Sequence, residues 1–145
     1  MMNLNELEIA VLEMMLVGDH PLLNEMRRQL AVCHVGGRDY TGHGFFTSLQ
    51  VDTNTVTFPQ LRRLVLGDIM VDAEGLEDSG GFALFIKDGL ISTLEGFSFA
   101  DIWPDQITTF RLWYFWSNTQ NYNNGERNWQ ALYDELDQTL KSIQD

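Results

Sequence analysis

Apolar residues recur with two different periods along the chain, and the change of period separates helical regions from strands. Residues 4–17 carry apolar side chains every three or four positions, which predicts a helix. Asn3 or Asn5 can cap the start of this helix, and Gly18 can end it. A second helix is predicted to begin at Pro21, because the fixed φ of proline suits the first helical position.

The middle of the chain alternates apolar and polar residues and is divided by glycines and short polar turns, which is typical of strands. Residues 56–66 are ambiguous, because Pro59 argues against a central strand there. The predicted strands cover residues 38–41, 45–51, 67–73, 80–86, 90–97 and 108–116.

The strands at 80–86 and 90–97 form the strongest hairpin signal, and the turn between them decides which residue lies opposite Glu95. A two-residue turn at Asp88-Gly89 places Glu95 opposite Phe82, among large hydrophobic side chains. A three-residue loop at 87–89 places Glu95 opposite Gly81, where there is room around a carboxylate. We therefore expect the three-residue loop.

The end of the chain carries the clearest amphipathic helix. Residues 117–125 are Asn-rich and are expected to form a loop, and Asn123 or Asn124 can cap the helix that follows. Its apolar stripe comprises Trp129, Leu132, Tyr133, Leu136, Leu140 and Ile143. Because short turns join the strands, the sheet is expected to be antiparallel. The sequence predicts an α+β fold, with an N-terminal helix pair, about six antiparallel strands and a C-terminal helix packed on one face.

Composition and net charge limit the number of domains and the class of binding partner. The chain has 145 residues, which suits a single domain over residues 1–145, and 44% of them are hydrophobic, enough for a core. Nine Lys and Arg residues stand against 21 Asp and Glu residues, giving a net charge of −12. This charge repels phosphate and disfavours nucleic acid as a ligand. It attracts a basic partner, although it can also serve solubility alone.

The same features point to a cytoplasmic protein. Cys33 is the single cysteine, so no internal disulfide can form, which fits a reducing compartment. The N-terminus lacks the basic segment of a signal peptide. No apolar run approaches the ~20 residues of a membrane span, so we expect no membrane partner.

No motif for a catalytic nucleophile, a nucleotide or a metal is present. The three histidines, His20, His34 and His43, lack the spacing of a metal site. The acidic run 68–78 lacks the spacing of a calcium loop. Cys33 and His34 are adjacent, so their side chains would point in opposite directions in an extended chain and could not form a catalytic pair. We therefore expect no catalytic residue, no metal and no cofactor.

A polar constellation remains as a candidate ligand pocket. If the strand that carries Arg38 lies near the hairpin, Arg38 can pair with Glu95. The pairing is either a structural ion pair, which we favour, or part of a pocket in which Glu95 acts as an acid or base. The candidate pocket residues are Arg38, Tyr40, His43, Glu95, Asp101 and Trp103.

Several blocks together resemble a group of small uncharacterised bacterial proteins. They are RDYTGHGFFT at 38–47, GGFALFIKDG at 80–89, LEGF at 94–97 and Trp103-Pro104. The resemblance spans residues 38–104 and implies no activity. In size and acidity the chain is also similar to immunity proteins, which neutralise partner toxins.

Two functions follow as expectations. The first is a non-enzymatic interaction protein, immunity-like in character, whose acidic surface binds a basic protein partner. The second is an enzyme or small-ligand binder with a polar pocket around Glu95, Tyr40 and His43. The absence of catalytic motifs favours the first.

Overall fold

The computed structural model describes residues 3–100, 102–116 and 125–144. It confirms the α+β fold, with an N-terminal helix pair, a six-stranded antiparallel sheet and a C-terminal helix. The strand order is β1-β2-β5-β4-β3-β6. The elements are α1 (Glu6–Leu16), α2 (Pro21–Leu30), β1 (Cys33–Tyr40), β2 (Gly44–Val51), β3 (Arg63–Ala73), β4 (Gly80–Lys87), β5 (Leu90–Ser98), β6 (Phe110–Tyr114) and α3 (Trp129–Gln144).

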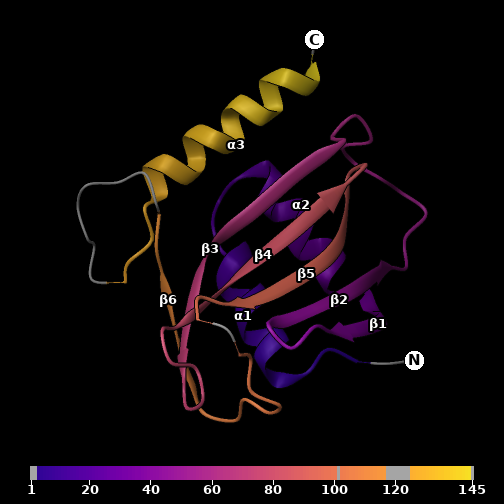
Figure 1. Ribbon diagram of the computed structural model, residues 1–145. Coiled ribbons are helices and arrows are strands. Elements are labelled where there is room, and N and C mark those ends of the chain that lie inside the picture. Colours follow the sequence, from indigo (N-terminus) through magenta and orange to yellow (C-terminus); the bar gives the residue numbers. More distant parts are fainter. Residues whose placement is uncertain (1–2, 101, 117–124, 145) are drawn as a thin grey trace.

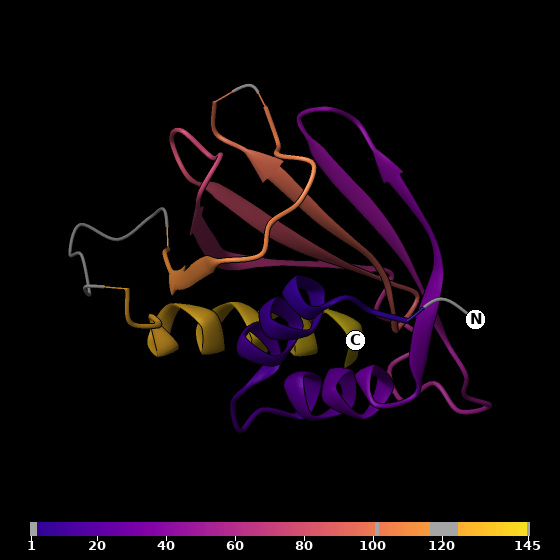
Figure 2. The same ribbon diagram turned by 90° about the horizontal axis from the view of Figure 1, so that it is seen from below.

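The helices lie on one side of the sheet. Figure 1 looks onto the other side, with α1 and α2 behind the strands, and Figure 2 shows α1, α2 and α3 beneath the same face of the curved sheet. The core fills the space between the two layers and includes Val11, Leu12, Met15, Met26, Phe82, Leu84, Ile86, Leu94 and Leu136. No described helix covers the opposite face of the sheet.

Caps fix the starts of the helices. The side chain of Asn5 accepts a hydrogen bond from the backbone N–H of Glu8 at 2.9 Å, while Glu8 accepts one from the backbone of Asn5 at 2.8 Å, which forms a capping box. At α2, Nδ1 of His20 accepts from the N–H of Leu22, and its Nε2 lies 2.9 Å from Asp137 on α3. His20 therefore caps α2 and ties it to α3.

The cap of α3 differs from the expectation. The Asn128 side chain accepts a hydrogen bond from the backbone N–H of Ala131 at 3.0 Å, so Asn128 caps the helix. The expected caps, Asn123 and Asn124, and most of the predicted loop 117–125 lie outside the described residues.

The central hairpin has a two-residue turn, so the expected three-residue loop is wrong. Asp88 and Gly89 have φ values of 51° and 82°, and both central residues of a type I′ turn require positive φ. Ile86 therefore pairs with Ile91. The register then shifts at a bulge, and Glu95 lies opposite Ala83, whereas neither predicted register contained a shift.

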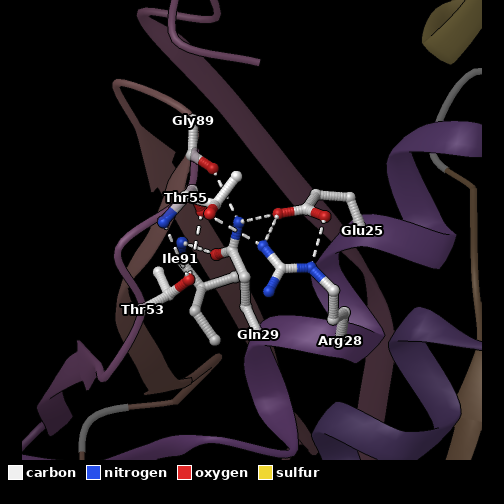
Figure 3. Close-up of polar contacts among 7 residues, drawn as sticks. All are labelled: Glu25, Arg28, Gln29, Thr53, Thr55, Gly89 and Ile91. Atoms are coloured by element: carbon white, nitrogen blue, oxygen red, sulfur yellow. Dashed lines mark hydrogen bonds and ion pairs between the residues drawn. The ribbon is translucent and has the colours of Figure 1, made fainter. Parts of the chain in front are cut away.

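Beside this turn, the side-chain amide of Gln29 on α2 makes hydrogen bonds to the hairpin backbone that a neighbouring strand would otherwise make (Figure 3). Strand β2 pairs with β5 only as far as Ser48 and Thr93, so the start of β5 has β4 on one side and no described strand on the other. The buried Gln29 amide fills the gap: its Oε1 accepts from the N–H of Ile91 and its Nε2 donates to the carbonyl of Gly89, both at 2.8 Å.

Glu25 and Arg28 hold the Gln29 side chain in place (Figure 3). The Gln29 Nε2 also donates to Glu25 at 2.9 Å, and Arg28 binds both carboxylate oxygens of Glu25 at 2.8 and 2.7 Å. The hydrogen bonds from Arg28 are the main cause of a lowered pKa at Glu25. Gln29 alone of the three side chains bonds the hairpin, Glu25 and Arg28 orient its amide, and Arg28 also donates to the carbonyl of Thr55 at 3.2 Å. The cluster therefore serves to dock α2 on the hairpin and is structural.

A buried arginine joins the helices to β3. Arg127 binds both oxygens of Asp68, at 2.8 and 3.2 Å, next to the β3 bulge. Its guanidinium also donates to the carbonyls of Met15 and Val17 at the end of α1. The carbon of that guanidinium lies 4.9 Å from the ring centre of Tyr114 on β6. One side chain thus connects α1, β3 and β6.

Candidate functional site

Glu95 lies on the face of the sheet that the helices leave uncovered. Along β5, the Leu94 side chain points into the core and Gly96 is buried on the same side, so Glu95 between them points outward. Its cross-strand neighbours are Ala83 on β4 and Phe46 on β2. Glu95 lies in the middle of a strand, as its sequence predicted.

A row of side chains crosses the sheet at this level. Asp39 on β1 lies opposite Phe46, and Phe46 lies opposite Glu95. We call Asp39, Phe46 and Glu95 the Phe46 row. Directly opposite residues on one face of a sheet have Cβ atoms ~5 Å apart, so the two carboxylates flank the Phe46 ring. That ring is 38% exposed.

Among the described residues, the carboxylates of the Phe46 row form no ion pair. Within residues 3–100, 102–116 and 125–144, neither Asp39 nor Glu95 has a side-chain hydrogen bond or ion pair. Partial burial raises the pKa of Glu95, and no hydrogen bond offsets this effect. The site therefore has negative charge that the described part of the chain does not neutralise.

Aromatic side chains surround the row on the same face. Phe97 follows Glu95 by two positions on β5, and its ring packs against Phe99 with the ring centres 5.6 Å apart. Phe99 is 51% exposed. Phe85 lies opposite Thr93, on the other side of Glu95. Exposed apolar groups with charge among them are typical of a protein-binding surface.

Arg38 does not pair with Glu95, so that expectation is wrong. Arg38 lies opposite Thr47, whose side chain is buried on the helix side of the sheet, and it binds Glu8 on α1. Glu8 also accepts a hydrogen bond from the Thr47 hydroxyl at 2.5 Å. Burial alone raises the pKa of Glu8, but the hydrogen bonds from Arg38, Thr47 and Asn5 outweigh it, so the pKa lies below its ordinary value.

Glu8 is a buried polar centre that was not predicted from the sequence. A capping-box pattern, Asn5 followed by Glu8, is visible in the sequence. That pattern predicts a solvated cap, whereas Glu8 is fully buried and binds a strand 30 residues away.

Tyr40 and Trp103 line a cavity on the helix side of the sheet. The cavity has a volume of about 390 Å³ and lies between the first turn of α1 and the segment 103–108. A smaller hollow of about 250 Å³ shares Tyr40 and Trp103 with it and extends to Gly42. Glu95 does not line either space and lies on the opposite face, so the predicted residues are divided between two places.

The remaining candidates are placed as follows. His43 lies in the turn between β1 and β2, where its carbonyl accepts from the N–H of Ser98, and it does not line the cavity. Asp101 lies outside the described residues. No cluster of three or more His, Cys, Asp or Glu side chains that could hold a metal occurs within the part of the chain described.

Comparisons with known proteins give no relative. No family model, no curated protein and no solved structure matches the chain. The site must therefore be interpreted from its own chemistry.

Proposed function

We propose that this chain is a non-enzymatic binding module that recognises a basic protein partner through the uncovered face of its sheet. The Phe46 row carries the proposal. A Lys or Arg side chain placed over the Phe46 ring would meet the ring face and the carboxylates of Asp39 and Glu95 together. The surrounding aromatic side chains would supply apolar contact area.

The charge of the whole chain supports the same class of partner. A net charge of −12 attracts a basic protein over a distance and repels nucleic acid. The partially buried carboxylate of Glu95 is costly to the isolated protein, and a cation would offset that cost. An immunity protein that neutralises a basic toxin would work in this way.

Membrane attachment through a helix receives no support. None of the described helices combines the length and apolar character needed to cross a bilayer. The single cysteine, Cys33, which cannot form an internal disulfide, supports the cytoplasm as the proposed compartment.

The test compares charge changes on the two sides of the molecule. The full chain and two variants, Glu95→Lys and Glu13→Lys, are immobilised and exposed to extract of the source cells at about 0.05 M and about 0.5 M salt. Both variants change the net charge equally, but Glu13 is exposed on α1, on the helix side. Thermal unfolding checks that each variant is folded.

We expect the wild-type chain and Glu13→Lys each to retain a basic protein in a molar amount near that of the immobilised chain. High salt should release this protein, and Glu95→Lys should not retain it. Glu95→Gln, which removes the charge without adding one, should retain less than the wild type. Equal retention by Glu95→Lys and Glu13→Lys would contradict recognition by the Phe46 row. So would the absence of any basic protein from the wild-type bait.

A further inference from the structure

The cavity beside Trp103 has walls of two chemical kinds. Phe45 and Trp103 pack edge to face with ring centres 5.4 Å apart, and Tyr40 lies against Phe45 at 6.5 Å. Trp103 and Phe45 are almost fully buried, whereas Tyr40 is 65% exposed. Two rings are thus fixed by the core, and the third has an accessible face at the entrance.

Acidic groups provide the charge in this cavity. Glu6, Glu8 and Asp105 line it, and no Lys, Arg or His does. Arg38 neutralises Glu8 from outside the lining. Glu6 and Asp105 are exposed and have no side-chain partner within residues 3–100, 102–116 and 125–144. An anion would therefore meet repulsion here, whereas a cation would find two free carboxylates.

We propose that this cavity is a second binding site, separate from the Phe46 row, which takes a guanidinium group such as that of an arginine derivative. A guanidinium is flat and weakly hydrated, so it stacks on aromatic rings and binds a carboxylate with two parallel hydrogen bonds. An ammonium group is more strongly hydrated and gains less from the rings. The volume of about 390 Å³ lies in the range of small-ligand sites.

The size of the expected effect follows from the contacts. One stacked cation and one or two exposed carboxylates support only weak binding, with a dissociation constant on the order of 1 mM. Removal of the Tyr40 ring or of the Asp105 charge should each weaken binding about three-fold. Tyr40→Ala and Asp105→Asn change exposed side chains, so both variants should fold.

The experiment is a titration of the ¹⁵N-labelled full chain with N-acetyl-arginine methylamide. The indole N–H of Trp103 and the backbone amides of residues 105–108 report on the cavity. The citrulline analogue has nearly the same shape without the charge, and the lysine analogue has the charge without the planar group. Tyr40→Ala, Asp105→Asn and Glu95→Gln are titrated in parallel.

The site is supported if the arginine analogue shifts these signals, the two analogues shift them much less, and Tyr40→Ala and Asp105→Asn each weaken the response. Equal shifts with the citrulline analogue would overturn the cation site, and equal shifts with the lysine analogue would overturn the preference for guanidinium. Glu95→Gln should leave the titration unchanged, because Glu95 lies on the other face. Loss of the response in that variant would show that the two sites are not separate.

Discussion

Arg38 on β1 binds Glu8 on α1 through two hydrogen bonds. Its Nη2 and Nε atoms lie 2.6 and 3.0 Å from the two carboxylate oxygens of Glu8. Glu8 is fully buried, while the Arg38 side chain is 17% exposed. Removing one partner of such a pair leaves the other charge uncompensated, which costs more than the pair itself contributes. The pair therefore fixes α1 on the sheet and controls one wall of the cavity beside Trp103.

Glu8→Gln should lower the free energy of unfolding by about 2–4 kcal/mol at pH 7, as measured by urea denaturation. Because the folded state lowers the pKa of Glu8, this stabilisation is complete above the unfolded pKa and is lost as pH falls through the folded pKa. The difference between wild type and variant should therefore shrink in acid. Glu13→Gln, an exposed change on the same helix, should stay within about 0.5 kcal/mol of wild type at both pH values.

Gln29→Met should destabilise the protein by about 2–4 kcal/mol, because the Gly89 carbonyl and the Ile91 N–H would be buried without partners. Methionine keeps the length and volume of the side chain, so lost packing contributes little. Gln60→Met, at an exposed position, serves as the control. Equal unfolding free energies for the two variants would show that the Gln29 amide does not stabilise the hairpin.

Arg127→Met should cost about 3–5 kcal/mol, since Asp68 would remain buried without its cation. Adding Asp68→Asn removes that charge and should recover part of the loss. The coupling between the two changes, obtained from a double-mutant cycle in urea, measures the interaction. Additive effects would contradict a stabilising interaction between Arg127 and Asp68.

The sequence predicted elements better than it predicted partners. The periodic stripes of α1, α2 and α3 and the alternation in β4 and β5 are local patterns, and the structure has these elements. In β6, which lies within the predicted strand 108–116, Phe110, Leu112 and Tyr114 pack against the core. Trp113 pairs with Met70 on the other side.

The hairpin register could not be derived from its own residues. The turn type was available from Asp88-Gly89, but the bulge beyond it changes the opposite residue for every position up to Gly80. The start of β5 is held by Gln29, 62 positions from Ile91 in the sequence. A local pattern carries no information about such a contact.

The candidate site shows the same limit. Glu95 was found because a carboxylate is rare in an apolar strand. Its partner was assigned wrongly, because Arg38 lies on the opposite face and binds a residue whose local pattern indicated only a helix cap. Asp39 and Phe46 flank Glu95 only because β2 lies between β1 and β5, a strand order that no local pattern determines.

Glu95→Gln should raise the free energy of unfolding at pH 7 by less than about 1 kcal/mol. The folded state raises the pKa of Glu95 through burial, so it binds the proton more tightly than the unfolded state does. The ionised carboxylate therefore costs stability at pH values above its folded pKa. As pH falls through that pKa, Glu95 becomes protonated and the wild type becomes more stable relative to the variant. The difference between their free energies of unfolding should then disappear.

Urea denaturation of wild type and Glu95→Gln between pH 7 and pH 4 measures this difference. Its sign is opposite to that expected for Glu8→Gln, because Glu8 has cationic and hydroxyl donors within the chain and Glu95 has none among the described residues. A Glu95→Gln variant less stable than wild type at pH 7 would show that the carboxylate contributes to the fold. A more stable variant that also loses the basic partner would mean that Glu95 lowers the stability of the free protein and serves binding.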